Sequence, residues 1–326
     1  MTGASSRLLT CNMLTKIYGG AKRKALDSVS YAVETKGIFV LIGRNGSGKT
    51  TLIRILSTEL EPTSGTASFD GIDVMKDAPS LREKIAIVPQ EARTVPWMTP
   101  MQTVSSYLMW RGFGYAEARK RASDALEGLG MRDYGDRLNR MLSGGMKRKV
   151  LVAAVLSSDA EIIFLDEPTT GLDPVSRREF WDLMREIEKE RFTFLTTHYL
   201  EEAETLGDRI GILDDGRLIR IGTLSDLRRS IRHSYSVVIP PGQKEPSLSV
   251  SDGEVMKGSY GSRILTGEEE AFSISRDLIR DGIKFTINPV SLDDIFFYLV
   301  TREGIDSAGD QGEDMEQLHQ YYKQEE

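Results

Sequence analysis

The sequence predicts an α/β fold built on a mostly parallel sheet, and two features of its patterning carry that prediction. Three short runs, GIFVLI (37–42), EIIFLD (161–166) and RFTFLTT (191–197), are almost continuously apolar, which is typical of strands buried on both faces. Helical patterns separate these runs along the chain. Such alternation favours parallel strands that are joined by helices covering the sheet.

The expected elements follow one another in a simple order. Residues 7–42 contain three β-rich runs, and the last of them leads into a Gly-rich loop at 43–50 and a helix that starts at Thr50 and ends before Pro62. Beyond this helix we expect an edge hairpin (66–74), a buried strand (85–90), helices (104–110, 116–129 and 174–190) and a hairpin that turns at Asp215-Gly216.

Composition divides the chain into three parts. Residues 1–225 are expected to form one large domain, with an antiparallel β subdomain at its N-terminal end and a helical subdomain at about 92–145. Shorter runs, including the amphipathic helix RDLIRDGI (276–283), predict a small α+β accessory domain at 226–300. Residues 301–326 carry eight acidic and two basic residues, so most of the net charge of −7 lies in a tail that we expect to be disordered.

Several features indicate a cytoplasmic protein. No apolar stretch approaches the roughly 20 residues of a membrane helix, and the first residues lack the pattern of a secretory signal. Cys11 is the single cysteine, so it cannot form an internal disulfide and is expected to be a plain structural thiol. Because the chain without its acidic tail is nearly neutral, no nucleic-acid partner is expected.

The Gly-rich loop carries the first chemical motif. GRNGSGKT (43–50) matches G-x-x-x-x-G-K-[ST], in which glycines allow backbone N–H groups to surround phosphate oxygens at a helix N-terminus. Lys49 is expected to reach the β- and γ-phosphates of ATP, and Thr50 to bind Mg²⁺. The expected nucleotide-binding residues of this loop are Gly43, Arg44, Asn45, Gly46, Ser47, Gly48, Lys49, Thr50 and Thr51.

A pair of carboxylates follows the apolar run EIIFLD. Asp166 and Glu167 stand at the end of this expected strand, where adjacent acidic side chains suggest a metal ion or a proton as their partner. We expect Asp166 to hold Mg²⁺, directly or through water, and Glu167 to accept a proton from the attacking water or to orient it.

These two motifs are shared by many NTPases, and a third one distinguishes among them. The segment MLSGGMKRK (141–149) resembles the LSGGQ signature of ABC ATPases and lies just ahead of EIIFLDEP, where that family keeps it. The resemblance covers essentially residues 7–222 and implies a RecA-like P-loop NTPase core. It further implies a head-to-tail dimer in which Ser143, Gly144 and Gly145 cap the γ-phosphate of ATP held by the other protomer.

Further positions match the family one by one. The resemblance implies that Tyr18 stacks on adenine, that Gln90 touches Mg²⁺ or its water and links the site to a membrane subunit, and that His198 contacts the γ-phosphate. Asp173 belongs to GLDP (171–174), which matches the D-loop. Taken alone, Tyr18 fits a surface aromatic, Gln90 a loop residue and His198 a core histidine, but their order and spacing favour the family roles.

One branch of the family resembles this chain in more detail. Met146 replaces the usual glutamine of the signature, as in ABC ATPases that serve drug, lipid and polysaccharide export, and THYLEEAE (197–204) and SLDDIFFYLV (291–300) resemble the same branch. The resemblance implies a Mg²⁺-dependent ATPase on the cytoplasmic face of the membrane that powers export through a separate transmembrane subunit. Its dimer partner would be a second copy or a paralogous ATPase.

Two segments leave alternatives open. Lys147, Arg148 and Lys149 place positive charge in the first turn of a helix, against the preference of the helix dipole, so either a negative group docks there or the residues form a solvated basic face. The segment from Gln90 to Tyr107 is the expected docking surface for the membrane subunit. Its apolar residues could instead pack the helical insertion; they are Trp97, Met98, Met101 and Tyr107.

Two other function classes remain as alternatives. A soluble ABC ATPase acting on ribosomes or nucleic acid generally has two cassettes or a long coiled coil, and this chain has neither feature. A P-loop kinase would leave LSGGM unexplained.

Overall fold

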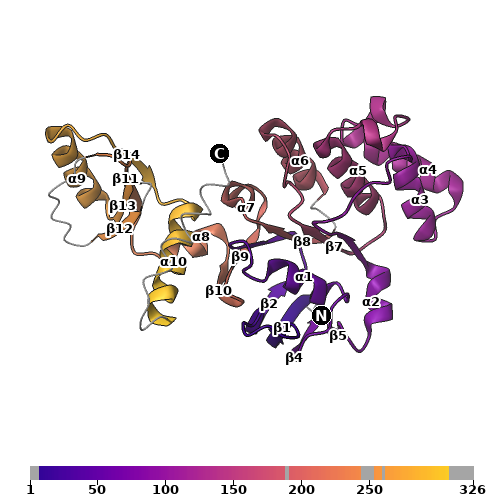
Figure 1. Ribbon diagram of the computed structural model, residues 1–326, viewed down its shortest axis with the longest axis horizontal. Helices are drawn as coiled ribbons and strands as arrows, with labels where there is room; N and C mark the ends of the chain where they lie inside the picture. Colours follow the sequence, from indigo (N-terminus) through magenta and orange to yellow (C-terminus); the bar gives the residue numbers. More distant parts are fainter. Residues whose placement is uncertain (1–6, 188–190, 244–252, 259–260, 308–326) are drawn as a thin grey trace, which may run out of the picture. The chain divides into compact units, whose positions relative to one another are not determined.

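The computed structural model describes residues 7–187, 191–243, 253–258 and 261–307, and the chain divides into two compact units, Met1–Leu218 and Ile219–Glu326. Figure 1 shows the course of the chain. The fold class predicted from the sequence is confirmed, because the first unit has a mostly parallel sheet, an antiparallel β subdomain and a helical region, and the second has a small α+β sheet.

The central sheet has six strands in the order β10-β9-β3-β8-β7-β6. Strands β3 (Ile38–Ile42), β6 (Ile85–Val88), β7 (Ile162–Asp166), β8 (Phe192–Thr197) and β9 (Arg209–Asp214) pair in parallel. Every residue of β3, β7 and β8 is buried, as the unbroken apolar runs predicted. β10 (Arg217–Gly222) follows β9 through Asp215 and Gly216, both with positive φ, so the predicted hairpin turn is confirmed.

A second sheet forms the antiparallel β subdomain, in the order β2-β1-β4-β5. Its strands are β1 (Leu8–Lys16), β2 (Leu26–Glu34), β4 (Ser64–Phe69) and β5 (Ile72–Asp73), so the edge hairpin expected at 66–74 is confirmed. The helix after the Gly-rich loop, α1 (Lys49–Leu56), is shorter than predicted. Thr58 adopts a left-handed backbone (φ 67°), and the amides of Glu59 and Leu60 both donate to the Arg54 carbonyl, which ends the helix.

The helical region contains α3 (Pro100–Trp110), α4 (Tyr115–Gly128) and α5 (Gly144–Leu156), which pack against one another. Small residues of α4 at i, i+4 spacing, Ala118 and Ala122, face buried Val104 of α3 and Val150 of α5 in one apolar cluster. The remaining helices of the first unit are α2 (Ala78–Lys84), α6 (Pro174–Ile187) and α7 (Leu200–Leu206), with 3-10 turns at Arg132–Tyr134 and Asn139–Met141.

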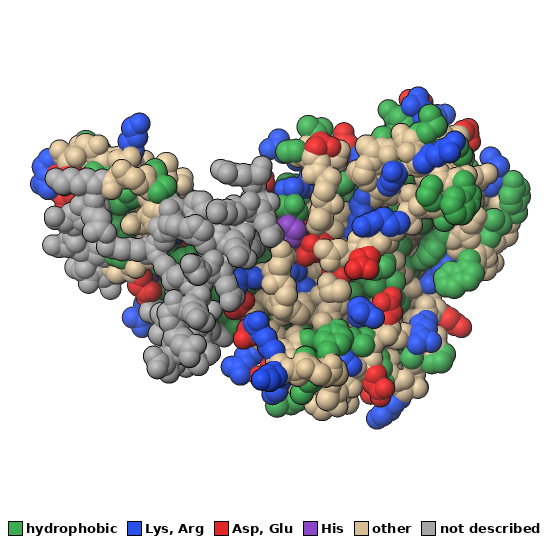
Figure 2. Space-filling view, viewed as in Figure 1, with side chains coloured by type: hydrophobic (Ala, Val, Ile, Leu, Met, Phe, Trp, Pro, Cys, Tyr) green, Lys and Arg blue, Asp and Glu red, His purple; other side chains and the backbone are tan. Residues whose placement is uncertain are grey.

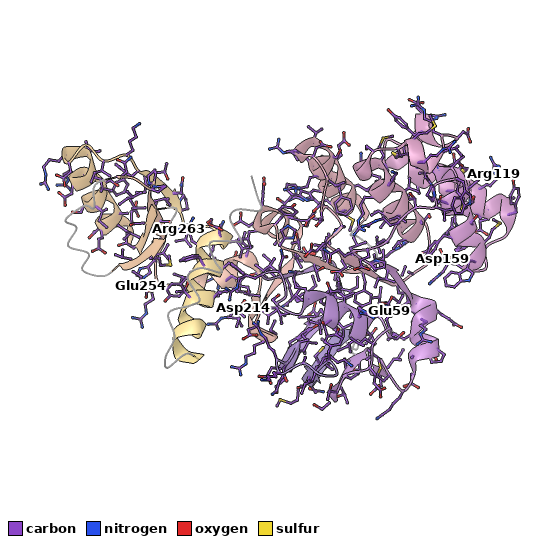
Figure 3. The ribbon with its side chains drawn as sticks, in the orientation of Figure 1. Glu59, Arg119, Asp159, Asp214, Glu254 and Arg263 are labelled. Carbon is purple, nitrogen blue, oxygen red and sulfur yellow. The ribbon has the colours of Figure 1, made fainter. Side chains whose placement is uncertain are left out.

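The second unit is built on an antiparallel sheet in the order β12-β13-β11-β14. Its strands are β11 (Tyr235–Ile239), β12 (Glu254–Gly258), β13 (Gly261–Thr266) and β14 (Thr286–Pro289), and its helices are α8 (Leu224–Arg229), α9 (Glu268–Arg280) and α10 (Leu292–Ser307). Arg263 of β13 pairs with Asp293 (2.5 Å) and Asp294 (2.9 Å) of α10, and this tie lies near the Arg263 label in Figure 3.

One prediction for this unit needs correction, and another falls partly outside the described residues. The helix expected at 276–283 starts earlier, at Glu268, because three acidic residues occupy its first turn and Ala271, Ile274 and Leu278 form a buried stripe of helical spacing. α10 continues to Ser307, so the first residues of the expected tail are helical. Residues 308–326, the rest of that tail, lie outside the described residues.

Candidate functional site

The register of the central sheet brings the predicted motifs to one edge. Ile42, the last residue of β3, pairs with Thr197 of β8, and Asp166 of β7 pairs with Thr196 of β8. The chain therefore leaves β3, β7 and β8 at the same level, and the Gly-rich loop, the carboxylate pair and His198 all emerge there. In open parallel sheets this carboxyl edge is the usual place for a ligand site.

The Gly-rich loop curls around its own lysine. Gly46 and Gly48 have φ values of 81° and 106°, a left-handed conformation that few other residues adopt. The Nζ atom of Lys49 donates to the carbonyl oxygens of Gly43 (2.7 Å) and Arg44 (3.1 Å), and its side chain is 4% exposed. Burial lowers the pKa of Lys49, although the charges of Glu167 and Asp166 oppose that shift.

Neighbouring strands fix the shape of the loop. The Arg44 guanidinium forms a bidentate pair with Asp214, at 2.9 and 2.8 Å, and Asp214 is labelled in Figure 3. The Ser47 carbonyl accepts from the amide of Gly216 at 3.0 Å. The Ser47 hydroxyl is buried and has no hydrogen-bond partner among the described residues. A preformed loop with a buried lysine and an unsatisfied hydroxyl fits a phosphate ligand.

Asp166 is the more deeply buried carboxylate of the pair, with 1% exposure. It accepts from the Thr196 hydroxyl at 2.5 Å and also bonds the side chain of Thr50. Burial raises the pKa of Asp166, while these two hydrogen bonds oppose the shift. The described residues contain no group of three or more His, Cys, Asp or Glu side chains that could hold a metal ion. Hard oxygen atoms of Asp166 and Thr50 nevertheless suit Mg²⁺, which commonly uses one or two protein carboxylates and completes its shell with phosphate and water.

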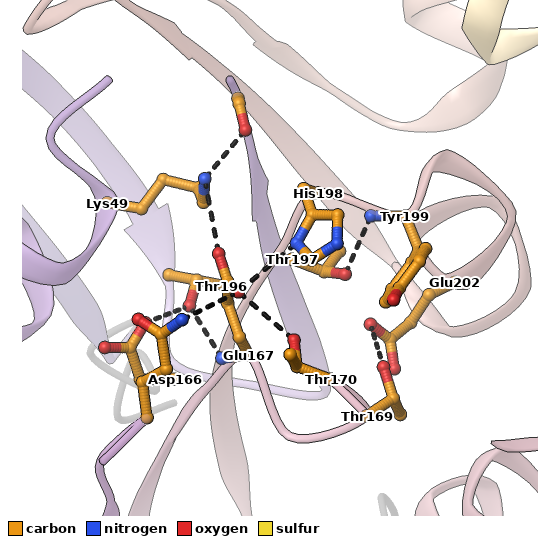
Figure 4. Close-up of polar contacts among 12 residues, drawn as sticks. Lys49, Asp166, Glu167, Thr169, Thr170, Thr196, Thr197, His198, Tyr199 and Glu202 are labelled. Atoms are coloured by element: carbon orange, nitrogen blue, oxygen red, sulfur yellow. Dashed lines mark hydrogen bonds and ion pairs between the residues drawn. The ribbon is translucent and has the colours of Figure 1, made fainter. Parts of the chain in front are cut away.

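The Glu167 carboxylate lies where four side chains converge, as Figure 4 shows. Its Oε2 accepts from Gln90 Nε2 (3.1 Å) and from Thr170 Oγ1 (3.1 Å), and His198 Nδ1 lies 3.2 Å from it. Lys49 Nζ is 3.6 Å from Oε1. Burial alone would raise the pKa of Glu167, but the hydrogen bond with His198 and the charge of Lys49 outweigh it, so this pKa is lowered and the group is a carboxylate at neutral pH.

The backbone of Glu167 has a positive φ of 46°, which is uncommon for a residue with a side chain. Its amide bonds both the carbonyl and the hydroxyl of Thr196, each at 3.1 Å. Such a conformation costs about 1–3 kcal/mol and persists only where neighbouring structure enforces it.

Tyr18 lies beside the loop, at the start of α1. Its hydroxyl is 3.2 Å from the Thr51 hydroxyl, its ring is 5.6 Å from the Lys16 ammonium, and the residue is 39% exposed. A partly exposed aromatic ring next to the Gly-rich loop is compatible with stacking on a ligand.

Ser143 and Asp173 both cap helices. The Ser143 hydroxyl accepts from the Met146 amide (3.2 Å) at the start of α5. Asp173 accepts from the Val175 and Ser176 amides, both at 3.0 Å, at the start of α6. Gly144 has no heavy atom within 4 Å of the place where a Cβ would stand, so the beginning of α5 is open to an approaching group.

Arg148 lies next to the site, and both environments that the sequence suggested for it are wrong. Neither a docking group nor solvent surrounds it, because it is buried and its guanidinium donates to four backbone carbonyls: Asp166 (2.8 Å), Pro168 (3.0 Å), Pro89 (3.1 Å) and Glu167 (3.2 Å). It therefore ties α5 to both segments that carry Gln90 and Glu167. Lys149 is likewise engaged, in an ion pair with Glu179. Arg148 stands four and seven residues before buried Val152 and Val155, and this shared helix face was the one signal in the sequence.

The apolar side chains between Gln90 and Tyr107 differ in their exposure. Trp97 is 75% exposed, whereas Met101 and Tyr107 pack against the helical cluster, so the alternative that they fill the insertion is confirmed for these two. On the face seen in Figure 2, Lys and Arg side chains of the first unit are interspersed with Asp and Glu, so this face has no continuous basic stripe. None of the described helices is long and apolar enough to span a bilayer.

Comparison with known proteins identifies the family of this chain. A family model for ABC transporters matches residues 26–170. The daunorubicin/doxorubicin resistance ATP-binding protein DrrA of Streptomyces peucetius is 38% identical over 71% of this chain and 70% of its own length. The doxorubicin resistance ATP-binding protein DrrA of Mycobacterium tuberculosis is 34% identical over 85% of this chain and 83% of its own length. Among solved structures, a dimeric bacterial ABC transporter cassette shares 27% identity and a TM-score of 0.61, covering 66% of this chain and 98% of the cassette.

Proposed function

The chain belongs to the ABC transporter family as an ATP-binding subunit that hydrolyses ATP, and from this premise we propose how its residues divide the work. Two copies, or one copy and a paralogous subunit, face each other head to tail around two nucleotides. Each site takes the Gly-rich loop, the carboxylate pair and His198 from one protomer, and Ser143, Gly144 and Gly145 from the other. A related cassette in dimeric form supports this arrangement.

The convergence on Glu167 is the observation that carries the proposal. A carboxylate that is ionised at neutral pH can orient the water that attacks the γ-phosphate by a hydrogen bond, or accept its proton. Gln90 and Thr170 hold its Oε2, and His198 is within 3.2 Å of the same oxygen. In this proposal His198 contacts the γ-phosphate and the base at once.

Lys49 is proposed to exchange partners when ATP binds. In the structure its ammonium lies among the Gly43 and Arg44 carbonyls and 3.6 Å from Glu167 Oε1. The β- and γ-phosphates offer it more negative charge than these groups, so it turns toward them and frees one oxygen of Glu167 for water. Tyr18 stacks on adenine, and the amides of residues 43–51 bind the phosphates.

Thr50 and Asp166, with Gln90, would hold Mg²⁺, which when bound neutralises charge on the β- and γ-oxygens of ATP. The Asp166–Thr50 hydrogen bond already brings two of these three side chains together. Asp173, which caps α6, orients the D-loop next to the dimer interface.

We place the transmembrane partner at residues 90–107, where Trp97 is the most exposed apolar side chain. The work of the subunit is then export across the cell membrane, from its cytoplasmic face. Since DrrA relatives are named for resistance to daunorubicin and doxorubicin, these two drugs are the cargo to test first.

The experiment is the substitution Glu167→Gln, which keeps the size and removes the negative charge. The variant should bind ATP, lose at least about 100-fold in phosphate release, as expected for a missing general base, and accumulate as a dimer on size exclusion with ATP. Near-normal turnover would remove Glu167 from this role.

Shared sites are tested by mixing two inactive variants, Lys49→Ala and Ser143→Arg. In a head-to-tail pair one site keeps an intact loop and an intact signature, so part of the activity should return. No recovery, while both variants still dimerise with wild type, would contradict the arrangement.

A further inference from the structure

Glu202 is a buried carboxyl that has no part in the mechanism above. It lies on α7 with 0% exposure, yet both of its oxygens are occupied. Oε2 accepts from the Thr169 hydroxyl and Oε1 from the Trp181 indole N–H, each at 3.1 Å, and the Thr197 side chain donates to it as well. Figure 4 shows Glu202 to the side of the contacts around Glu167, with a dashed line to Thr169.

These partners come from three elements that surround the catalytic edge. Thr169 lies in the loop after β7, Trp181 on α6, and Thr197 at the end of β8. One carboxyl group thus joins the segment that carries Glu167, the segment that carries His198, and the helix that Asp173 caps.

Two of the three partners stand next to residues that contact Glu167. Thr169 precedes Thr170, whose hydroxyl donates to Glu167 Oε2 at 3.1 Å. Thr197 precedes His198, whose Nδ1 is 3.2 Å from the same oxygen. The Thr197 hydroxyl also accepts from the Tyr199 amide at 3.0 Å, which fixes the chain on the other side of His198.

The chemistry of the position argues against simple space filling. Burial of a carboxyl group is unfavourable unless hydrogen bonds compensate it, and an apolar side chain of similar size would occupy a core position at lower cost. Burial raises the pKa of Glu202, with the three hydrogen bonds and the charge of Arg177 opposing that shift. What the carboxyl group adds is directional bonding to three segments at once.

We propose that Glu202 is a positioning residue that holds Thr170 and His198 against Glu167, through its hydrogen bonds to Thr169 and Thr197. The proposal rests on the assignment of Glu167 as the base. Loss of these hydrogen bonds should leave the nucleotide-binding loop intact, because none of the bonds described for Glu202 involves residues 43–51. The effect should therefore fall on kcat and not on the KM for ATP.

The test compares Glu202→Met, Glu202→Gln and the matched control Glu201→Met in the full-length chain, by phosphate release over a range of ATP concentrations. Glu201 is exposed on the same helix, so its variant should behave as wild type. Glu202→Met should lower kcat about 10- to 100-fold with the KM changed less than threefold. Glu202→Gln can accept from Trp181 and donate to Thr169, so it should retain kcat within about threefold.

Two outcomes overturn the proposal: a kcat of Glu202→Met within threefold of wild type, or a loss in the Gln variant as large as in the Met variant. If Glu202→Met does not fold, Thr169→Val removes one bond at nearly constant size, and an unchanged kcat there is equally decisive. Glu167→Gln is measured in parallel. Should that variant stay active, the base assignment fails; should it be inactive while Glu202→Met is active, only the role of Glu202 fails.

Discussion

Replacement of Arg148 by methionine tests whether one guanidinium holds the catalytic segments to α5. Methionine is apolar and replaces the aliphatic part of the side chain but not the guanidinium, so four carbonyl oxygens lose their donor. Two of these carbonyls belong to Asp166 and Glu167 and share one nitrogen of the guanidinium.

The expected change in stability follows from two opposing contributions. Hydrogen bonds from a charged donor contribute about 1.5–3 kcal/mol each, so with the shared nitrogen counted once the loss of three bonds costs about 5–9 kcal/mol. Burial lowers the pKa of Arg148 from 12.5 to about 10, so removal of this disfavoured charge returns about 3 kcal/mol. The net destabilisation is about 2–6 kcal/mol, which corresponds to a loss of at least about 4 °C in Tm for a unit of this size.

Lysine at this position should give a Tm no higher than that of the methionine variant. It keeps the desolvated charge, but a single ammonium cannot reach carbonyls that are distributed around a planar fork. For turnover we expect a loss of about 10- to 100-fold in both variants, because Glu167 would no longer be held in its strained backbone conformation.

The assays are thermal unfolding and phosphate release by the full-length chain, with Lys147→Met on the same helix turn as control. The reasoning is refuted if Arg148→Met melts within 1 °C of wild type and retains full kcat. A Lys variant with a clearly higher Tm and kcat than the Met variant would show that the charge matters and that the planar guanidinium does not.

Two further predictions concern buried titratable groups. Burial raises the pKa of Cys11 to about 12, so a thiol reagent at pH 8 should label the native chain at least about 100-fold more slowly than the unfolded chain; equal rates would place the thiol at the surface. Glu202 has a pKa above its ordinary 4.5, so the folded state loses stability as pH rises from about 4.5 to the raised value, while glutamine does not titrate. The Tm of Glu202→Gln minus that of wild type should therefore increase between pH 4.5 and neutral pH, and a constant difference would contradict the raised pKa.

The central sheet and its site were predictable because their signals are local. Apolar runs identified β3, β7 and β8, and each motif follows one of them, so parallel pairing alone brings Lys49, Glu167 and His198 together. The elements of the second unit were harder to predict from the sequence. Its strands β12 and β13 mix polar and apolar residues, as in EVMKG and GSRILT, and the start of α9 reads as alternating until the buried stripe is seen.

The residues that support the site left weaker signals than the residues that act in it. Arg148 and Glu202 are charged, and in sequence a charged residue on a helix is more often solvated than buried. Their burial follows from tertiary packing, since the carbonyls that Arg148 bonds lie 18 to 59 residues away along the chain and the Thr169 partner of Glu202 lies 33 away. No local pattern encodes such a partner.

The position of Arg148 also bears on how two composite sites communicate. Helix α5 begins at Ser143 to Gly145, which we assign to the partner's nucleotide. Within the first two turns of the same helix, Arg148 donates to the carbonyls of Pro89 and Glu167 in its own protomer. Pro89 precedes Gln90, so a displacement of α5 by the partner's nucleotide must shift Gln90 and Glu167 together or break these hydrogen bonds. A dimer with one Arg148→Met protomer tests whether these hydrogen bonds transmit the displacement, because its wild-type protomer keeps them. If the guanidinium transmits the displacement, the variant protomer should lose its response to the partner's nucleotide while its own loop still binds ATP.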